Sequence, residues 1–343
     1  MRAFHVTGPG ELELREQESP SPGPGELVLE IRTALTCGTD LKLFRRGHPH
    51  MPFPTPIGHE FAGVVVEAGE GARFAVGTEL MSVHTAPCGQ CRLCEVGQEN
   101  LCDEAMKSMT LGAFAERLLL PEPVVRINAF EKPAHLPWAH AAFLEPLACC
   151  VQGIQDIDVR EGDCVVVIGA GPIGLMHVQL AKQRGASKVV MVGRRAARLE
   201  AAKAVGADAV IDQQSGTHEE ITAAVRAAGG GLGPDVVIEC AGVPEAWEQA
   251  VDYCRRGGRV LWFGGCKPGT EVKLDTRRVH YDQITTMGVF HFTPRAVAEA
   301  RRLLVEGVLE MDAMLSGSMS LDQLPEALAR IGRGEGVKYA LVP

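Results

Sequence analysis

Residues 165–176, VVVIGAGPIGLM, decide the fold of the second half of this 343-residue chain. An apolar run leads directly into Gly169-x-Gly171-x-x-Gly174, and a helical pattern follows. In a dinucleotide-binding turn, the first glycine permits the tight turn, the second lets a pyrophosphate approach the backbone, and the third allows close helix–strand packing. Pro172 suits a first helical turn, and Ile173 follows it. Because a strand and a helix flank the motif, it predicts a dinucleotide site rather than a glycine-rich turn without a ligand.

Short apolar runs alternate with helical patterns from about residue 150 onwards, as expected for strands buried on both faces. The expected strands are Cys164–Ile168, Lys188–Val192, Ala209–Ile211, Val236–Cys240, Arg259–Phe263 and Ile284–Val289. The expected helices are Ile173–Arg184, Ala196–Val205, Glu219–Ala228, Glu245–Arg255 and Pro294–Val305. Six β/α repeats predict an α/β fold with a doubly wound parallel sheet of the Rossmann type.

The first 145 residues or so follow a different pattern, in which β-like runs are separated by glycine and proline. These runs are Glu11–Glu16, Glu26–Leu35, Phe61–Glu67, Thr78–Val83 and Ala113–Leu120. They predict an irregular, mostly antiparallel β domain. We expect the C-terminal segment to return to it, so that residues 1–148 and 292–343 form one domain and residues 149–291 form the other.

The composition and net charge argue against some classes of binding partner and against a membrane span. A net charge of -9 argues against a nucleic-acid or anionic-membrane partner. The longest uncharged stretch, Cys164–Ala181, is interrupted by glycine and proline and reads as strand, turn and helix rather than a membrane span. Eleven cysteines, an odd number, with no export signal at the N-terminus, favour a reducing compartment, the cytoplasm.

The strand after the glycine motif bears on the choice of cofactor. A site for the ribose 2′-hydroxyl of NAD places an acidic residue about 20 residues further on, but here the strand ends in Gly193, Arg194 and Arg195. A glycine leaves room for a 2′-phosphate, and guanidinium groups grip one, so we expect a preference for NADP over NAD. The alternative is that both arginines are a solvated helix start. Three strand-end residues are expected to line the nicotinamide half of the site: Cys240, Ala241 and Gly264.

The clearest sequence motif for a metal site is PCGQCRLCEVGQENLC, residues 87–102. Its spacing is C-x2-C-x2-C-x7-C, formed by Cys88, Cys91, Cys94 and Cys102. Four thiolates on one short loop make a closed tetrahedral zinc site with no position for a substrate. An iron–sulfur cluster is the alternative, although the x7 gap and the absence of a proline after Cys102 count against it.

A second, sparser group of candidate ligands is spread over the first domain. It comprises Cys37, His59, Glu60 and Glu145. Mixed sulfur, nitrogen and oxygen ligands from distant segments are typical of a zinc site with an open position. Because His59 and Glu60 are neighbours, a regular strand would point them to opposite faces, so either the backbone is irregular there or only one of them binds at a time.

Six motifs occur in the order in which the zinc-dependent medium-chain dehydrogenases have them. They are CGTD, GHEFAGVVVEAG, PCGQCRLCEVGQENLC, GAFAERLLLP, EPLA and GAGPIG. The chain resembles that family over nearly its whole length, and most of all its sorbitol and threonine dehydrogenase branch. The resemblance implies a GroES-like N-terminal domain, a structural zinc on the four-cysteine loop, and a homodimer or homotetramer.

The resemblance also implies a mechanism. Cys37, His59 and a carboxylate, Glu60 or Glu145, would hold a catalytic zinc that polarises an alcohol oxygen, and hydride then passes to the nicotinamide. Thr39 matches the family's hydroxyl that passes the alcohol proton onward. Where threonine and sorbitol dehydrogenases usually have a relay histidine, this chain has Lys42.

That departure argues against threonine as the substrate and leaves sorbitol itself open. We therefore expect a secondary alcohol of a polyol, cyclitol or sugar, interconverted with its ketone. The alternatives are a reductase of simple aliphatic or aromatic carbonyls and, from another class, a catalytically silent NADP-binding sensor or structural protein. The full ligand set argues against a silent protein, which has no need of an open metal site.

Overall fold

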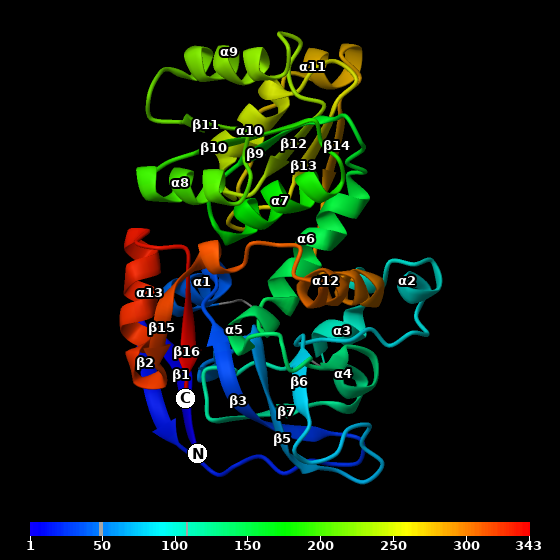
Figure 1. Ribbon diagram of the computed structural model, residues 1–343, viewed down its shortest axis with the longest axis vertical. Coiled ribbons are helices and arrows are strands. Elements are labelled where there is room, and N and C mark those ends of the chain that lie inside the picture. The colour runs from blue at the N-terminus through cyan, green and yellow to red at the C-terminus, as the bar shows by residue number, and fades with distance from the viewer. Residues whose placement is uncertain (48–50, 108) are drawn as a thin grey trace. The chain divides into compact units, whose positions relative to one another are not determined.

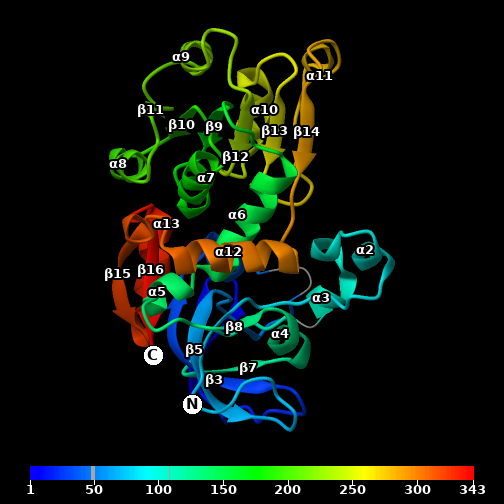
Figure 2. The same cartoon turned by 45° about the vertical axis from the view of Figure 1, so that its right-hand side comes forward.

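The computed structural model describes residues 1–47, 51–107 and 109–343. The chain divides into two compact units. Unit 1 comprises Met1–Ala148 and Phe292–Pro343, and unit 2 comprises Cys149–His291. Figures 1 and 2 show the elements of each unit from two directions.

Unit 2 is built on one six-stranded sheet in which every pairing is parallel. Its strands are β9 (Cys164–Ile168), β10 (Lys188–Gly193), β11 (Ala209–Asp212), β12 (Val236–Glu239), β13 (Arg259–Trp262) and β14 (Thr285–Gly288). Their spatial order is β11-β10-β9-β12-β13-β14. The chain therefore reverses direction across the sheet between β9 and β12, where doubly wound folds bind ligands. The predicted Rossmann-type sheet is confirmed.

Helices cover both faces of this sheet. They are α7 (Pro172–Gln183), α8 (Ala196–Ala204), α9 (His218–Ala228), α10 (Pro244–Tyr253) and α11 (Thr276–Tyr281). Figures 1 and 2 show α7 and α8 on one face and α9, α10 and α11 on the other. Between the sheet and the second group lies a core rich in β-branched side chains, including Val166, Ile168, Val190, Val237 and Val260. The short α11 has no counterpart among the predicted elements.

Unit 1 contains two sheets and is mostly antiparallel, as predicted. The larger has the order β15-β16-β3-β5-β6-β8, with β7 also paired to β3, and the smaller has the order β2-β1-β4. Their strands are β1 (Arg2–Gly8), β2 (Glu11–Glu16), β3 (Leu27–Leu35), β4 (Thr55–Pro56), β5 (Phe61–Ala68), β6 (Glu79–Ser82), β7 (Arg117–Leu120), β8 (Ala129–Glu131), β15 (Leu315–Ser320) and β16 (Lys338–Val342). The prediction made β7 four residues too long at its N-terminal end and had no counterpart for β1, β4, β8, β15 and β16.

Short helices occupy the connections of unit 1. They are α1 (Gly38–Arg46), α2 (Arg92–Glu95), α3 (Asp103–Lys107), α4 (Glu122–Ile127), α5 (Trp138–Ala141), α12 (Pro294–Glu306) and α13 (Leu324–Arg333), with single 3₁₀ turns at Glu99–Leu101, Asp312–Met314 and Leu321–Gln323. Helix α6 (Leu144–Asp156) begins in unit 1 and ends in unit 2.

The C-terminal segment completes the large sheet of unit 1. Strand β16, red in Figure 1, pairs antiparallel with β3, which is blue. Strand β15 then adds to β16 in parallel, whereas the other pairings described in this sheet are antiparallel. The sheet therefore depends on residues from both ends of the chain.

Among the residues that the structure describes, no helix combines the length and the apolar character needed to cross a bilayer.

Candidate active site and metal centres

Cys37 lies at the N-cap of α1, in an extended conformation with φ -126° and ψ 154°. Its sulfur accepts a hydrogen bond from the backbone N–H of Thr39 at 3.4 Å, and its own N–H donates to Asp40 Oδ2 at 2.9 Å. This reciprocal capping fixes both the helix start and the direction of the thiol. Thr39 and Lys42 lie on α1 close to Cys37, and both are exposed.

His59 and Glu60 lie in irregular backbone immediately before β5. Gly58 has φ +100°, and a Cβ added to it would lie 2.8 Å from the backbone nitrogen of Phe114, so only glycine fits there. Because the backbone is not a regular strand, the two side chains are not forced to opposite faces. The first of the two sequence-based alternatives, irregular backbone, is confirmed.

Cys37, His59 and Glu60 come together: one ligand atom from each lies within 4.8 Å of the others. His59 Nδ1 lies 3.2 Å from Asp40 Oδ1, which orients the ring and leaves Nε2 for a metal. Burial by itself lowers the pKa of His59, but Asp40 and Cys37 outweigh it and raise that pKa well above its ordinary value. One sulfur, one nitrogen and one oxygen donor fit a zinc ion with an open fourth position.

Glu60 is completely buried and forms an ion pair with Lys338 of β16. Lys338 Nζ also donates to the carbonyl oxygen of Thr36 at 2.7 Å. Burial raises the pKa of Glu60, while the Lys338 ammonium acts in the opposite direction. Within the described part of the chain, Glu60 Oε1 has no hydrogen-bond partner. An unsatisfied buried carboxylate oxygen is costly, and a cation beside it would relieve that cost.

Glu145, in the first turn of α6, lies against His84 rather than with the other three candidate ligands. Its Oε1 is 3.6 Å from His84 Nδ1, and both side chains are buried. The His84 ring in turn meets the His59 ring edge to face, with centroids 5.3 Å apart. The imidazole of His84 thus lies between Glu145 and the group formed by Cys37, His59 and Glu60.

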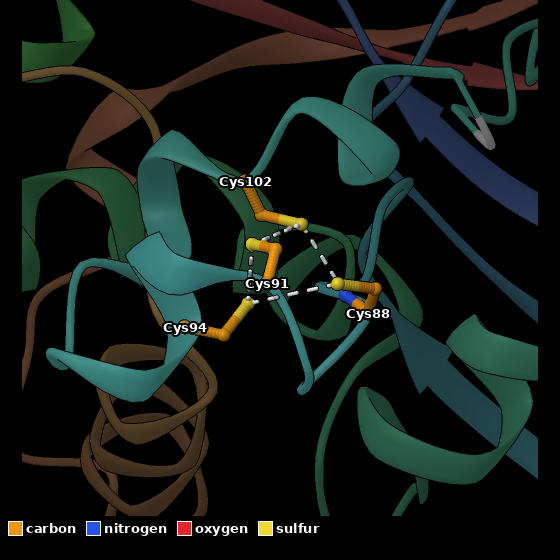
Figure 3. Close-up of side chains that lie close together, drawn as sticks. All are labelled: Cys88, Cys91, Cys94 and Cys102. Atoms are coloured by element: carbon orange, nitrogen blue, oxygen red, sulfur yellow. Dashed lines mark hydrogen bonds between the residues drawn. The ribbon is translucent and has the colours of Figure 1, made fainter.

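The four predicted loop cysteines gather as Figure 3 shows. The sulfur–sulfur distances are 3.5 Å for Cys91–Cys94, 3.8 Å for Cys91–Cys102 and 4.0 Å for Cys88–Cys94. Sulfurs at tetrahedral corners about 2.3 Å from one zinc ion lie roughly 3.8 Å apart, so the loop fits a single ion. Ligands of an iron–sulfur cluster bind different iron atoms and would lie farther apart.

The thiols of this loop do not titrate alike. Burial would raise the pKa of Cys102, but the backbone amides of Cys88 and Ala105 lower it to about 7. Burial and the neighbouring Cys91 raise the pKa of Cys94 to about 12. Four sulfurs this close cannot all ionise without a cation among them, which is the charge that zinc supplies.

The glycine turn of unit 2 follows β9 and leads into α7 at Pro172. Gly169 has φ +107°, and a Cβ added to Gly174 would lie 2.0 Å from the carbonyl oxygen of Gly169. Gly171 has no atom within 4 Å of such a Cβ, which leaves its outer side open to a ligand. Ile173 lies in the first turn of α7, and Cys240, Ala241 and Gly264 follow the ends of β12 and β13.

At the end of β10, Gly193 is buried, whereas Arg194 and Arg195 are exposed. A Cβ on Gly193 would lie 2.9 Å from the Cβ of Ala170, so packing against the glycine turn also requires glycine there. Arg195 is the N-cap of α8 with φ +75°, a backbone conformation that residues other than glycine rarely adopt.

The sequence prediction missed three residues of the unit 1 site: Asp40, His84 and Lys338. Asp40 had a signal, since an acidic residue three positions after Cys37 has capping-box spacing. His84 stands shortly before the four-cysteine loop but matches no spacing rule. Lys338 lies 278 residues from Glu60 in sequence, and only the return of β16 brings them together.

Two family models match the chain, one in each half. Residues 23–129 match the alcohol dehydrogenase GroES-like domain, and residues 172–306 match the zinc-binding dehydrogenase model. Taken with the relatives below, the chain belongs to the zinc-dependent medium-chain alcohol and polyol dehydrogenase family, a family of oxidoreductases.

Relatives match almost end to end. A sorbitol dehydrogenase of Halalkalibacterium halodurans is 30% identical over 98% of this chain and 97% of its own length. A D-arabitol-phosphate dehydrogenase of Enterococcus avium is 31% identical over 91% and 88%, respectively. A solved zinc-binding dehydrogenase of Sinorhizobium meliloti, bound to NADP, is 34% identical with a TM-score of 0.91, covering 100% of this chain and 99% of that one.

Proposed function

We propose that this protein is a zinc-dependent, NADP-preferring oxidoreductase that interconverts a secondary alcohol of a polyol, cyclitol or sugar and its ketone. The observation that carries the proposal is the group formed by Cys37, His59 and Glu60, whose donor atoms lie within 4.8 Å of one another. That group is needed by a metal-dependent enzyme and not by a silent cofactor-binding protein. The named activities of the relatives support a polyol-like substrate.

Unit 1 would provide the chemistry. Cys37, His59 and Glu60 hold the catalytic zinc, with Glu145 behind them next to His84. A zinc ion in such a site acts as a Lewis acid that favours loss of the alcohol proton. Asp40 orients His59, and the exposed Thr39 hydroxyl receives that proton for transfer towards solvent. The exposed Lys42 stands one turn further along α1 and takes the place of a relay histidine.

Unit 2 would bind the cofactor. The pyrophosphate lies on the turn of Gly169, Gly171 and Gly174 and at the N-terminus of α7, where backbone N–H groups are available. Arg194 and Arg195 grip the 2′-phosphate of NADP. The uncommon backbone conformation of Arg195 supports this role, because strained residues gather at functional sites. NAD would bind without that contribution.

The four-cysteine loop would hold a second, structural zinc, giving two zinc ions per chain. Thiolate ligands need a reducing compartment such as the cytoplasm to stay reduced. The assembly would be a homodimer or homotetramer, and the edge strand β14, with Thr285 and Gly288 exposed, is a candidate for contact between copies.

A substrate panel tests the proposal. Polyols, cyclitols, sugars and simple secondary alcohols are offered with NADP⁺ and with NAD⁺, and turnover is read from the absorbance of the reduced cofactor. We expect activity on polyol-like alcohols, with kcat/KM higher for NADP⁺. Activity on apolar alcohols alone would contradict the substrate class, and a clear preference for NAD⁺ would contradict the role of the arginines.

Two variants separate the parts of the proposal. Cys37→Ser should keep NADPH binding and lose turnover, and parental turnover in this variant would contradict the catalytic zinc site. The double variant Arg194→Ala/Arg195→Ala should lose roughly tenfold or more in kcat/KM for NADP⁺ while changing little for NAD⁺. Arg184→Ala, an exposed arginine at the end of α7, is the matched control.

A further inference from the structure

Glu239 carries a completely buried carboxyl group at the end of a central strand of the unit 2 sheet. It is the last residue of β12, paired on one side with Ile168 of β9 and on the other with Trp262 of β13. Within the described part of unit 2 it has no ion-pair partner. A buried carboxyl without a cation is expensive to keep, and the proposed chemistry above does not use it.

This carboxyl folds the following segment back on itself. Glu239 Oε1 accepts hydrogen bonds from the backbone N–H groups of Ala241, at 2.6 Å, and Gly242, at 2.8 Å. Gly242 has φ +66°, which lets the chain turn tightly enough for both amides to face one oxygen. Hydrogen bonds from amides to an ionised carboxylate are short and strong, so the ionised side chain fixes segment 240–242.

Two glycine-rich turns enclose the same segment. A Cβ on Gly169 would lie 3.0 Å from the backbone nitrogen of Ala241, and a Cβ on Gly264 would lie 2.4 Å from that of Gly242. The Gly264 turn is itself held, because Trp247 Nε1 donates to the Gly264 carbonyl at 2.8 Å and the Trp247 ring stacks on Trp262. Segment 240–242 is thus packed against both turns, while Ala241 remains exposed.

The segment lies where the strand order reverses, between β9 and β12. Resting on the proposed function, we infer that Glu239 is a positioning residue: its carboxylate holds the amides of Ala241 and Gly242 so that segment 240–242 forms the wall against which the nicotinamide half of the cofactor binds. Cofactor binding therefore favours the ionised form of Glu239.

The surroundings make this group titrate near neutrality. Burial raises the pKa of Glu239 to about 7, although the amides of Gly242, Ala241 and Gly264 act to lower it. The elements packed around it present Ile168, Trp262 and Trp247, which carry no charge. Among the described residues, the Cys240 thiol is a titratable neighbour, and burial raises the pKa of that thiol well above its ordinary value. Of these two groups, Glu239 is therefore the one that changes its charge near pH 7.

The test measures NADPH binding to the full chain by fluorescence titration from about pH 6 to about pH 8. The second ligand is 2′,5′-ADP, which carries the 2′-phosphate but has no nicotinamide. Both ligands carry the same 2′-phosphate, but 2′,5′-ADP also has a 5′-phosphate that titrates at about pH 6. The pH dependence due to Glu239 is therefore read as the difference between the parent chain and Glu239→Gln, in which the titrations of both ligands cancel. Relative to Glu239→Gln, we expect that ratio in the parent chain to favour NADPH increasingly as pH rises through 7.

In Glu239→Gln, we expect the ratio to follow only the titration of the ligands, and NADPH binding at the upper pH to be roughly tenfold weaker, with 2′,5′-ADP binding the same as in the parent. Glu239→Asp keeps the charge on a shorter arm, so it should bind NADPH more weakly but retain the pH dependence. Glu245→Gln, at an exposed position in the first turn of α10, is the matched control and should behave as the parent.

Parental NADPH binding and pH dependence in Glu239→Gln would overturn the inference. Equal weakening of both ligands would also overturn it, because it would mean a general structural role. If the parent prefers NADH, the same comparison uses NADH and ADP. A parent chain that binds no nicotinamide dinucleotide contradicts the proposed function itself, which distinguishes the two failures.

Discussion

His177 in α7 is a buried histidine that the proposed chemistry leaves unused. It is completely buried, and neither ring nitrogen has a hydrogen-bond partner among the described residues. Its ring meets that of Phe263 edge to face, with centroids 4.9 Å apart. Burial lowers the pKa of His177 to about 3, so the folded protein keeps the imidazole neutral.

This histidine predicts a loss of stability in acid. Below pH 6.5, the ordinary pKa of histidine, His177 is protonated in the unfolded chain but stays neutral in the folded chain down to about pH 3. The free energy of unfolding therefore decreases as pH falls through this window. The slope is at most about 1.4 kcal/mol per pH unit. Urea unfolding at several pH values should show a shallower loss for His177→Leu than for the parent. Equal slopes would contradict the prediction, and His280→Gln, at an exposed histidine, is the control.

The buried pair of Glu60 and Lys338 predicts a coupled effect on stability. Lys338→Met leaves the Glu60 carboxylate buried without its cation, which should destabilise the protein by about 3–5 kcal/mol. Glu60→Gln combined with Lys338→Met removes both charges and should recover most of that loss. Urea unfolding of the two single variants and the double variant gives the coupling energy, with zinc content checked for each. Additive effects would mean that the pair does not act as a unit.

At the scale of elements, the sequence located the strands of unit 2 to within one residue at most ends. Strands such as β9 and β10 are apolar throughout because both faces are buried, and glycines or helices bound them clearly. The prediction missed β1, whose seven residues stand at the N-terminus with no preceding turn, and α11, which is a single short helix. Local pattern is weakest for such elements.

The candidate site was predictable only in part, for a similar reason. The glycine turn and the four-cysteine loop are local motifs, so their spacing identified them. Cys37, His59 and Glu60 come from separate segments, and their grouping depended on the family resemblance. The approach of Glu145 to His84, and of Lys338 to Glu60, depends on tertiary packing that no spacing rule describes.

The four-cysteine loop predicts a metal-dependent element. Between Cys88 and Cys102 it contains a four-residue helix and a 3₁₀ turn, and it exposes Val96 and Leu101, so apolar burial contributes little. The structural zinc proposed for this loop would therefore supply much of its folding free energy. Cys94→Ser should lose one of two zinc ions, lower the Tm by several degrees, and keep turnover per folded molecule. An unchanged Tm with abolished turnover would reverse the assignment of the two metals, and Cys266→Ser is the control outside the loop.

The two units differ in how the chain builds them. Unit 2 is one continuous segment, and its sheet and the core cluster beneath α9 and α10 consist of its own residues. Unit 1 is assembled from both ends of the chain, and its core includes Leu324, Leu328 and Leu341 from the C-terminal segment. Folding of unit 1 therefore requires contacts between residues about 300 positions apart, such as Lys338 with Thr36.

That difference predicts opposite outcomes for two fragments. Residues 144–291, which keep α6 whole, should fold alone, with a cooperative urea transition and protected amides in β9, β10 and β12. Residues 1–291 should keep the same protected strands but lose protection in β3, because β16 no longer pairs with it and Glu60 loses Lys338. Hydrogen exchange on both fragments and on the full chain provides the comparison. Full protection of β3 in residues 1–291 would show that the C-terminal strands only cover a sheet that is already stable.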